Sequence, residues 1–285
     1  MEEQISAALM DGQVMVNGQV FCSSDYLAFH QRRIAYTVQK LRQIGAKRIV
    51  EIGAHPWMMS AALIDDPEFT LCATVSAEEV TNWPDDIGVT AQPYHIRTER
   101  GHQTHVVNYA ANIERTRFDL QERPDTVVAC EIVEHLIRAP HMMFLNINRW
   151  MPVGGKLLVT TPNGAQFANP FRRKSPMPAY RCNIYERHAY LYTLDELTEL
   201  MMLCGFRVAE AGYWDVYERH GLSSIYQVLS HLPWRYCRDK FMRTIAVVGE
   251  KEQEVATLER PPRVYAPHGH WEYIKQSNRD ESGSS

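Results

Sequence analysis

The chain has 285 residues and a net charge of −4 with no long run of lysine or arginine, which argues against a general nucleic-acid or membrane surface. Hydrophobic residues make up 45% of the sequence, enough for a large buried core, but no apolar run approaches the roughly 18 residues of a membrane-spanning helix. The N-terminus is acidic, where a signal peptide begins with basic residues, and the six cysteines lack CxxC spacing, so we expect reduced thiols in the cytoplasm.

The first part of the chain predicts helices and strands in alternation. A helical stretch from Asp25 to Ile44 has a repeating apolar face and ends at Gly45. Short apolar runs predict strands at 48–53 and 70–75, a helix over 58–64 between them, and a third strand within 105–110. We therefore expect an N-terminal helical extension over 1–44, followed by a main domain over 45–250.

A strand, helix, turn and strand follow in the centre of the chain. The run 125–130 is β-branched, as a buried strand is, and 156–161 is the second strand. Between them, 132–151 has room for a crossover helix of about five turns. This unit predicts a parallel sheet, in which Glu131, Glu134 and His135 follow the carboxyl end of a strand. Open α/β sheets bind their ligands at that edge.

The last part of the chain combines regular elements with two irregular segments. A helix is predicted over 194–204, and strands over 207–211 and 243–249. The polar and aromatic segment 163–192 is expected to cover the mouth of a site. The segment 251–285 is proline-rich and polar, so we expect a C-terminal extension that ends in a disordered tail.

Three motifs, in this order, carry a family resemblance. They are Val50-Glu51-Ile52-Gly53, the run from Glu131 to Leu136, and the run from Pro152 to Asn163. Together they resemble class I S-adenosylmethionine-dependent methyltransferases, over about residues 48–249. The resemblance implies an α/β, Rossmann-like fold: a seven-stranded, mostly parallel sheet with helices on both faces and an antiparallel last strand.

The same resemblance implies a site for S-adenosyl-L-methionine, with two departures. The family's G-x-G-x-G turn reads Gly53-Ala54-His55-Pro56-Trp57, although some glycan-modifying members are similar in having a proline and an aromatic residue there. After the second strand, the usual acidic residue is replaced by Thr74 and Ser76; their hydroxyls would substitute, or Glu78 or Glu79 would reach back. Residues after the third strand would contact the adenine. The implied cofactor contacts are Glu51, Gly53, Ala54, His55, Thr74, Ser76, Asn112, Ile113 and Cys130.

The Glu-x-x-Glu-His cluster predicts a metal site. At helical spacing Glu131, Glu134 and His135 share one face, and two adjacent carboxylates favour a cation between them. We expect Mg²⁺ or Mn²⁺, with His188 as the fourth ligand. This set is similar to that of small-RNA 2′-O-methyltransferases and ubiquinone-pathway O-methyltransferases, in which it implies a metal that binds the acceptor oxygen. Without a metal, Glu131 would face the cofactor, and His188 would be a general base.

We therefore expect an S-adenosylmethionine-dependent O-methyltransferase with His135 and His188 as catalytic residues. Aromatic and arginine side chains within 163–192 suit sugars, flat rings and anionic groups, so a saccharide or small secondary metabolite is the first candidate acceptor. A small RNA is the second, because the metal motif fits it, but the net charge argues against strong phosphate binding. The third alternative is an inactive methyltransferase fold that serves as a binding partner.

Overall fold

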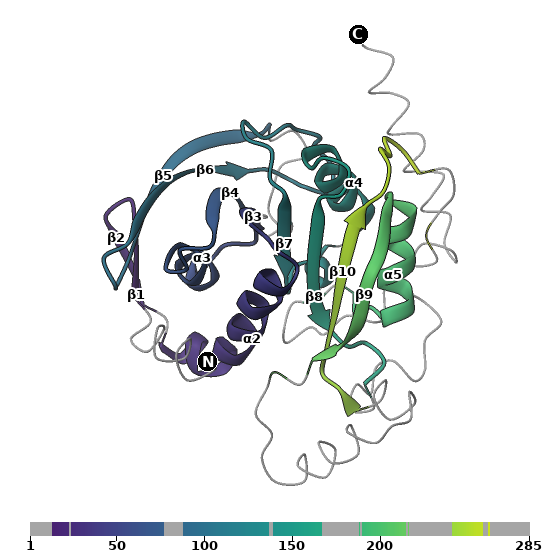
Figure 1. The fold of residues 1–285 in the computed structure, drawn as a ribbon, viewed down its shortest axis with the longest axis horizontal. Coiled ribbons are helices and arrows are strands. Elements are labelled where there is room, and N and C mark those ends of the chain that lie inside the picture. The colour runs from purple at the N-terminus through teal and green to yellow at the C-terminus, as the bar shows by residue number, and fades with distance from the viewer. Residues whose placement is uncertain are drawn as a thin grey trace.

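The computed structural model describes residues 13–22, 24–76, 88–136, 139–166, 188, 190–214, 216, 241–258 and 262. In this part of the chain, one ten-stranded sheet runs in the order β2-β1-β5-β6-β4-β3-β7-β8-β10-β9 (Figure 1). The strands are β1 (Gln13–Val16), β2 (Gln19–Cys22), β3 (Arg48–Ile52), β4 (Thr70–Ser76), β5 (Thr90–Thr98), β6 (Gln103–Ala110), β7 (Thr126–Cys130), β8 (Lys156–Pro162), β9 (Phe206–Trp214) and β10 (Thr244–Lys251).

The helices are α2 (Ser24–Gln43), α3 (Met58–Ile64), α4 (Pro140–Trp150) and α5 (Leu194–Leu203), with a short 3₁₀ turn, η1 (Val133–His135). None of the helices among the described residues is long and apolar enough to cross a membrane.

Seven of the strands form the arrangement that the sequence predicts. Strands β6, β4, β3, β7 and β8 are parallel, and β10 is antiparallel to both β8 and β9. This confirms the α/β, Rossmann-like fold with a largely parallel sheet. Strands β5, β1 and β2 extend the sheet antiparallel beyond β6 and were not predicted. The first half of β5 is exposed and includes Pro93, so it lacks the apolar pattern of a buried strand.

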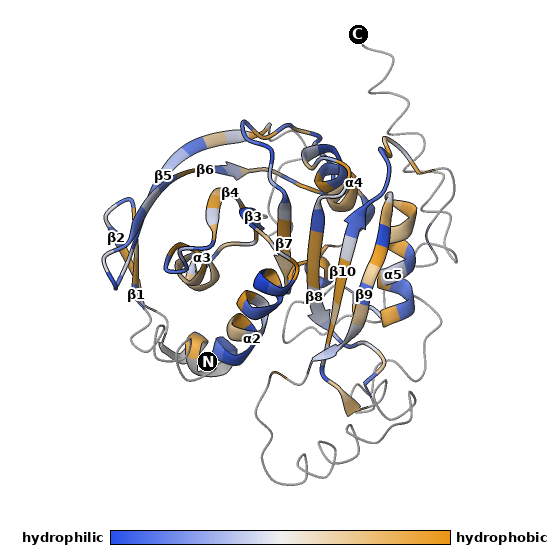
Figure 2. Ribbon diagram, in the orientation of Figure 1, coloured by the Kyte–Doolittle hydropathy of each residue, from blue (hydrophilic) through white to orange (hydrophobic). Residues whose placement is uncertain are grey.

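Helices cover both faces of the sheet and divide the core into two layers. On one face, α2 and α3 pack on residues such as Ile49 and Val128. On the other, α4 and α5 pack on their neighbours in sequence, Val50 and Val127. Successive strand residues point to opposite faces, so one apolar run serves both layers. In Figure 2 the central strands β7 and β8 are mainly hydrophobic, whereas β5 is largely hydrophilic.

Most of the predicted elements are confirmed within a few residues, but two are corrected. The helix predicted over 132–151 is wrong in its first part, because η1 comes first and α4 begins only at Pro140. Proline suits the first turn of a helix, where its missing N–H leaves no bond unmade. The N-terminal extension, predicted as helical, contains α2 but also the hairpin of β1 and β2. The division of the chain at residue 45 stays a prediction.

The first part of the predicted C-terminal extension, residues 251–258, packs against the end of α4. Lys251 is buried, and its ammonium donates hydrogen bonds to the carbonyl oxygens of Asn148 and Met151 at the end of α4, at 2.6 and 2.7 Å. It also contacts the Glu254 carboxylate. The Asn148 side chain donates to the Gln253 carbonyl oxygen, so the end of α4 holds this segment. Apart from 262, later residues lie outside the described part.

Replacing Lys251 with methionine is expected to lower the free energy of unfolding by about 2–4 kcal/mol, because two buried carbonyl groups lose their donor. The matched control is Lys156→Met, since Lys156 pairs with Glu250 near the surface and its loss costs under about 1 kcal/mol. Urea unfolding measures both. Equal losses in the two variants would contradict the capping role of Lys251.

Candidate functional site

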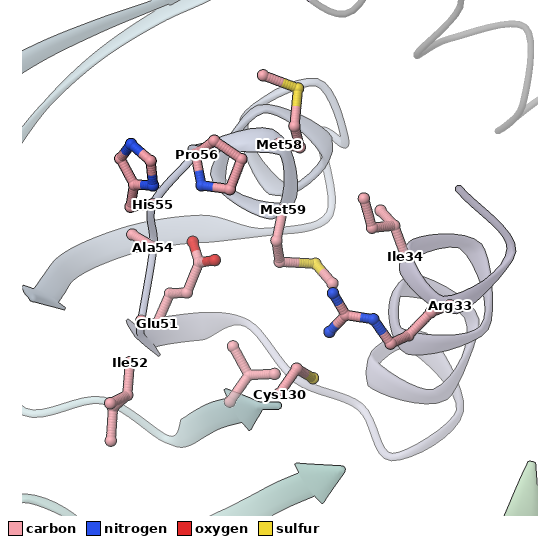
Figure 3. A pocket seen from close by; sticks show the side chains of 12 residues that line it. Arg33, Ile34, Glu51, Ile52, Ala54, His55, Pro56, Met58, Met59 and Cys130 are labelled. Carbon is pink, nitrogen blue, oxygen red and sulfur yellow. The ribbon is translucent and has the colours of Figure 1, made fainter. Parts of the chain in front are cut away.

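A pocket opens at the carboxyl ends of β3 and β7, on the face covered by α2 and α3 (Figure 3). Its lining comes from three stretches of the sequence, on α2, from β3 to α3, and on β7, which meet at the edge of the sheet where open α/β folds bind ligands. The lining residues are Arg33, Ile34, Glu51, Ile52, Gly53, Ala54, His55, Pro56, Met58, Met59, Val128 and Cys130. Five predicted cofactor residues are therefore brought together here: Glu51, Gly53, Ala54, His55 and Cys130.

Glu51 is a buried carboxyl group at the base of this pocket. The Ser60 hydroxyl on α3 donates to its Oε2 at 2.5 Å. Burial raises the pKa of Glu51 to about 7, against the opposing effects of the Ser60 hydrogen bond and the positive charge of Arg33. The group can therefore change its charge near neutral pH when a ligand brings a positive charge to it.

Arg33 is a charged pocket residue that the sequence did not predict. It lies on α2, is 4% exposed, and reaches into the pocket in Figure 3. His30, Arg33 and Thr37 are spaced three and four residues apart, so they share one side of the helix. The Thr37 Oγ1 lies 3.7 Å from the Cys130 sulfur at the end of β7. This polar stripe, in which Arg33 and Thr37 are buried, is the signal that could have identified Arg33.

Gly53 follows β3 in a conformation that requires glycine. Its φ is +78°, and a Cβ there would lie 1.9 Å from the Ile132 side chain. Its N–H donates to the Val75 carbonyl oxygen at 2.8 Å, which fixes the turn beside β4. The first glycine of the predicted cofactor turn is therefore retained for a physical reason.

The other predicted cofactor residues do not line this pocket. Thr74 and Ser76 both donate to the Asn108 Oδ1 on β6, at 2.8 and 2.9 Å. Asn112 accepts a hydrogen bond from the Glu114 N–H within a turn, and Ile113 is 1% exposed in the core beneath α4. The alternatives Glu78 and Glu79, and most of the predicted covering segment 163–192, lie outside the described residues.

A second cluster consists of Glu134, His135 and His188. One possible ligand atom from each lies within 4.8 Å of the others, and Glu134 Oε1 is 4.0 Å from both Nε2 atoms. The Glu134 side chain is fully buried, and its Oε2 accepts a hydrogen bond from the Thr161 hydroxyl at 2.9 Å. Its Oε1 has no hydrogen-bond partner among the described residues. The cluster therefore holds a buried carboxylate oxygen that faces two imidazoles.

Charge neutralisation is the dominant electrostatic feature of this cluster. Burial and the neighbouring Glu131 raise the pKa of Glu134 well above its usual value. Burial and His135 lower the pKa of His188 to about 4, so its imidazole is neutral at neutral pH. The Tyr190 N–H donates to the Glu134 carbonyl oxygen at 3.1 Å, which holds the segment after His188 against η1.

Glu131 lies outside the group formed by Glu134, His135 and His188, although its charge acts on Glu134, and its role as a metal ligand stays a prediction. Residues 131–135 are not an α-helix: Glu131 has a φ of +57° and precedes η1, so the expected spacing does not apply. Its carboxylate accepts a hydrogen bond from the Thr160 hydroxyl at 2.9 Å. Thr160 and Thr161 are consecutive on β8 and point to opposite faces of the sheet, so Glu131 and Glu134 are hydrogen-bonded from different faces of β8.

The strand order, the antiparallel β10 and the position of the pocket define the fold of a class I S-adenosylmethionine-dependent methyltransferase. The family model described as "Methyltransferase domain" matches residues 26–211, so the chain belongs to this methyltransferase family. A search of curated proteins found no match.

Three solved structures are among those to which the chain is similar. The [4+2]-cyclase SpnF is 12% identical with a TM-score of 0.50, over 78% of this chain and 81% of that one. The N-methyltransferase NodS from Bradyrhizobium japonicum WM9, bound to S-adenosylhomocysteine, is 10% identical with a TM-score of 0.44, over 79% and 88%. The small RNA methyltransferase HEN1 is 15% identical with a TM-score of 0.48, over 82% of this chain and 26% of that one.

Proposed function

We propose that this methyltransferase transfers a methyl group to a hydroxyl of a saccharide or small secondary metabolite, assisted by a divalent metal ion. The observation that carries the proposal is the convergence of Glu134, His135 and His188 at the edge of the sheet where the Glu51 pocket opens. S-adenosylmethionine supplies the activated methyl group, and the residues of the chain position both reactants.

The residues of the pocket fit the amino-acid end of this cofactor. Arg33 and Glu51 place opposite charges in one buried site, which matches the carboxylate and the ammonium group of a methionine moiety. Gly53 lines the same pocket, so its backbone would lie beside the cofactor. Arg33 would hold the carboxylate and Glu51 the ammonium, so the two charges fix the orientation of the cofactor.

The second cluster fits a divalent ion. Metal bonds to imidazole nitrogen and carboxylate oxygen are about 2.0–2.2 Å long. Atoms 4.0 Å apart, as Glu134 Oε1 is from each Nε2, can therefore share one ion between them. Two imidazoles and one carboxylate suit Mn²⁺ better than Mg²⁺. Such an ion would lower the pKa of a bound acceptor hydroxyl.

The low pKa of His188 favours this interpretation over general-base catalysis. A general base works best when its pKa lies near the operating pH, whereas the pKa of His188 is about 4. A neutral imidazole is instead the form that binds a metal. His135 and His188 are therefore proposed as ligands that prepare the acceptor.

The test is a calorimetric titration of S-adenosylhomocysteine with and without Mn²⁺, followed by methyl transfer to paired acceptors: a vicinal diol and the same compound with one hydroxyl blocked. We expect stoichiometric cofactor binding, and turnover on the diol that chelators abolish. If the protein methylated a short RNA and not the diol, a small RNA would replace the saccharide or metabolite as the proposed acceptor. A failure to bind S-adenosylhomocysteine under either condition would support the inactive binding protein.

A further inference from the structure

The cofactor turn carries two rings where the family pattern has glycines. His55 and Trp57 occupy the second and third glycine positions of Gly53-Ala54-His55-Pro56-Trp57. Trp57 has a φ of +72°, a region that favours glycine, so the backbone keeps the glycine conformation although the side chain is large. A strained residue of this kind persists only where its surroundings hold it in place.

Both rings pack against strands that the seven-stranded core does not include. Trp57 is 5% exposed, and its ring centroid lies 5.5 Å from that of Tyr94 on β5. His55 makes an edge contact with Phe21 on β2, with the ring centroids 5.9 Å apart. In Figure 3 the His55 ring extends from the turn on the side away from Cys130.

The added strands also pack around Trp57. Val14 and Val16 of β1 and Ile96 of β5 are buried in the same apolar cluster as the indole. Helix α3, which begins directly after Trp57, contacts β1 and β5, and Figure 1 shows it lying inside the curve of the sheet. The hairpin and β5 therefore supply the surroundings that the bulky turn needs.

We propose that Phe21 and Tyr94 are positioning residues of the cofactor site, acting through His55 and Trp57 to keep the turn open toward Glu51. The inference rests on the proposed function for its link to cofactor binding, but the packing of the turn can be measured without any cofactor. Packing of Phe21 and Tyr94 on the two rings explains how the turn keeps its backbone conformation although His55 and Trp57 replace two glycines.

The test uses the full-length protein with Tyr94→Ala, Tyr94→Phe and the matched control His95→Ala. His95 is the next residue on β5, and its ring stacks on His105 instead of on the turn. Hydrogen exchange of the 53–64 backbone and the affinity for S-adenosylhomocysteine are the two measurements. We expect Tyr94→Ala to speed exchange and to weaken binding about 3- to 10-fold, with Tyr94→Phe and His95→Ala near wild type.

The variant Ile245→Val controls for a general loss of stability, because it changes the core on β10 away from the turn. It distinguishes such a loss from a local effect on the turn. If this variant also speeds exchange in 53–64, or if Tyr94→Ala leaves both measurements unchanged, the inference is overturned. Should Tyr94→Ala not fold, Phe21→Ala takes its place. Faster exchange in Tyr94→Ala, in a protein that never binds S-adenosylhomocysteine, would support the positioning role while rejecting the proposed function.

Discussion

Replacing His188 with alanine is expected to weaken Mn²⁺ binding by about 100-fold or more. Loss of a residue that only hydrogen-bonds to a metal ligand already lowers metal affinity by roughly 10–100-fold, and His188 is proposed as a ligand itself. Turnover should fall at least as far. The affinity for S-adenosylhomocysteine in the absence of metal should stay within about twofold, since His188 does not line the Glu51 pocket. Calorimetry with Mn²⁺ and with S-adenosylhomocysteine measures the two effects separately.

The matched control is His105→Ala, which removes an imidazole from the exposed surface of β6. It should leave both affinities unchanged. If His188→Ala lost turnover but still bound Mn²⁺ like the wild type, His188 would be a general base and not a ligand. Unchanged turnover would reject both roles for this residue.

Replacing Glu51 with glutamine is expected to stabilise the protein at pH 8 and to weaken cofactor binding there. The pKa of Glu51 is raised to about 7 in the folded chain, against an ordinary value of 4.5, so folding favours the protonated form. The corresponding stability is present below about pH 4.5 and is lost as the pH rises through 7, by about 3 kcal/mol in all. Glutamine keeps the neutral form at every pH.

The gain in unfolding free energy from Glu51→Gln should therefore be small at pH 5 and reach up to about 3 kcal/mol at pH 8. Binding of S-adenosylhomocysteine at pH 8 should weaken about 10- to 100-fold, because a charged hydrogen bond is lost. Urea unfolding and calorimetry at the two pH values test this. Glu210→Gln, an exposed partner of Lys40, should show neither effect. A destabilised Glu51→Gln protein at pH 8 would contradict the assignment.

The sequence predicted the elements whose apolar pattern matches their burial. Strands β3 and β7 are buried apolar runs, and α5 begins at a capping box formed by Thr193 and Glu196. Strand β5 could not be recognised in the same way, because its first four residues are exposed and one of its two partners, β1, lies far from it in the sequence. The contact between β5 and the turn at Gly53–Trp57 is a tertiary contact, so the local sequence pattern does not predict it.

The candidate site was predicted best where residues follow a strand. Glu51 and Cys130 end neighbouring parallel strands, so topology alone brings them together. Glu131 was misplaced because helical spacing was assumed where the chain forms a 3₁₀ turn. Arg33 was missed because an α2 residue can reach the pocket only through tertiary packing.

Two neighbouring threonines on β8 fix the positions of two carboxylates that lie outside the strand. Thr160 holds Glu131 on one face, and Thr161 holds Glu134 on the other. A deletion or insertion of one residue within β8 would exchange the two faces, and each hydroxyl would then meet the wrong carboxylate. Changes in length near this site should therefore be tolerated in the loops that flank β8 but not within the strand, even where its apolar pattern could be restored.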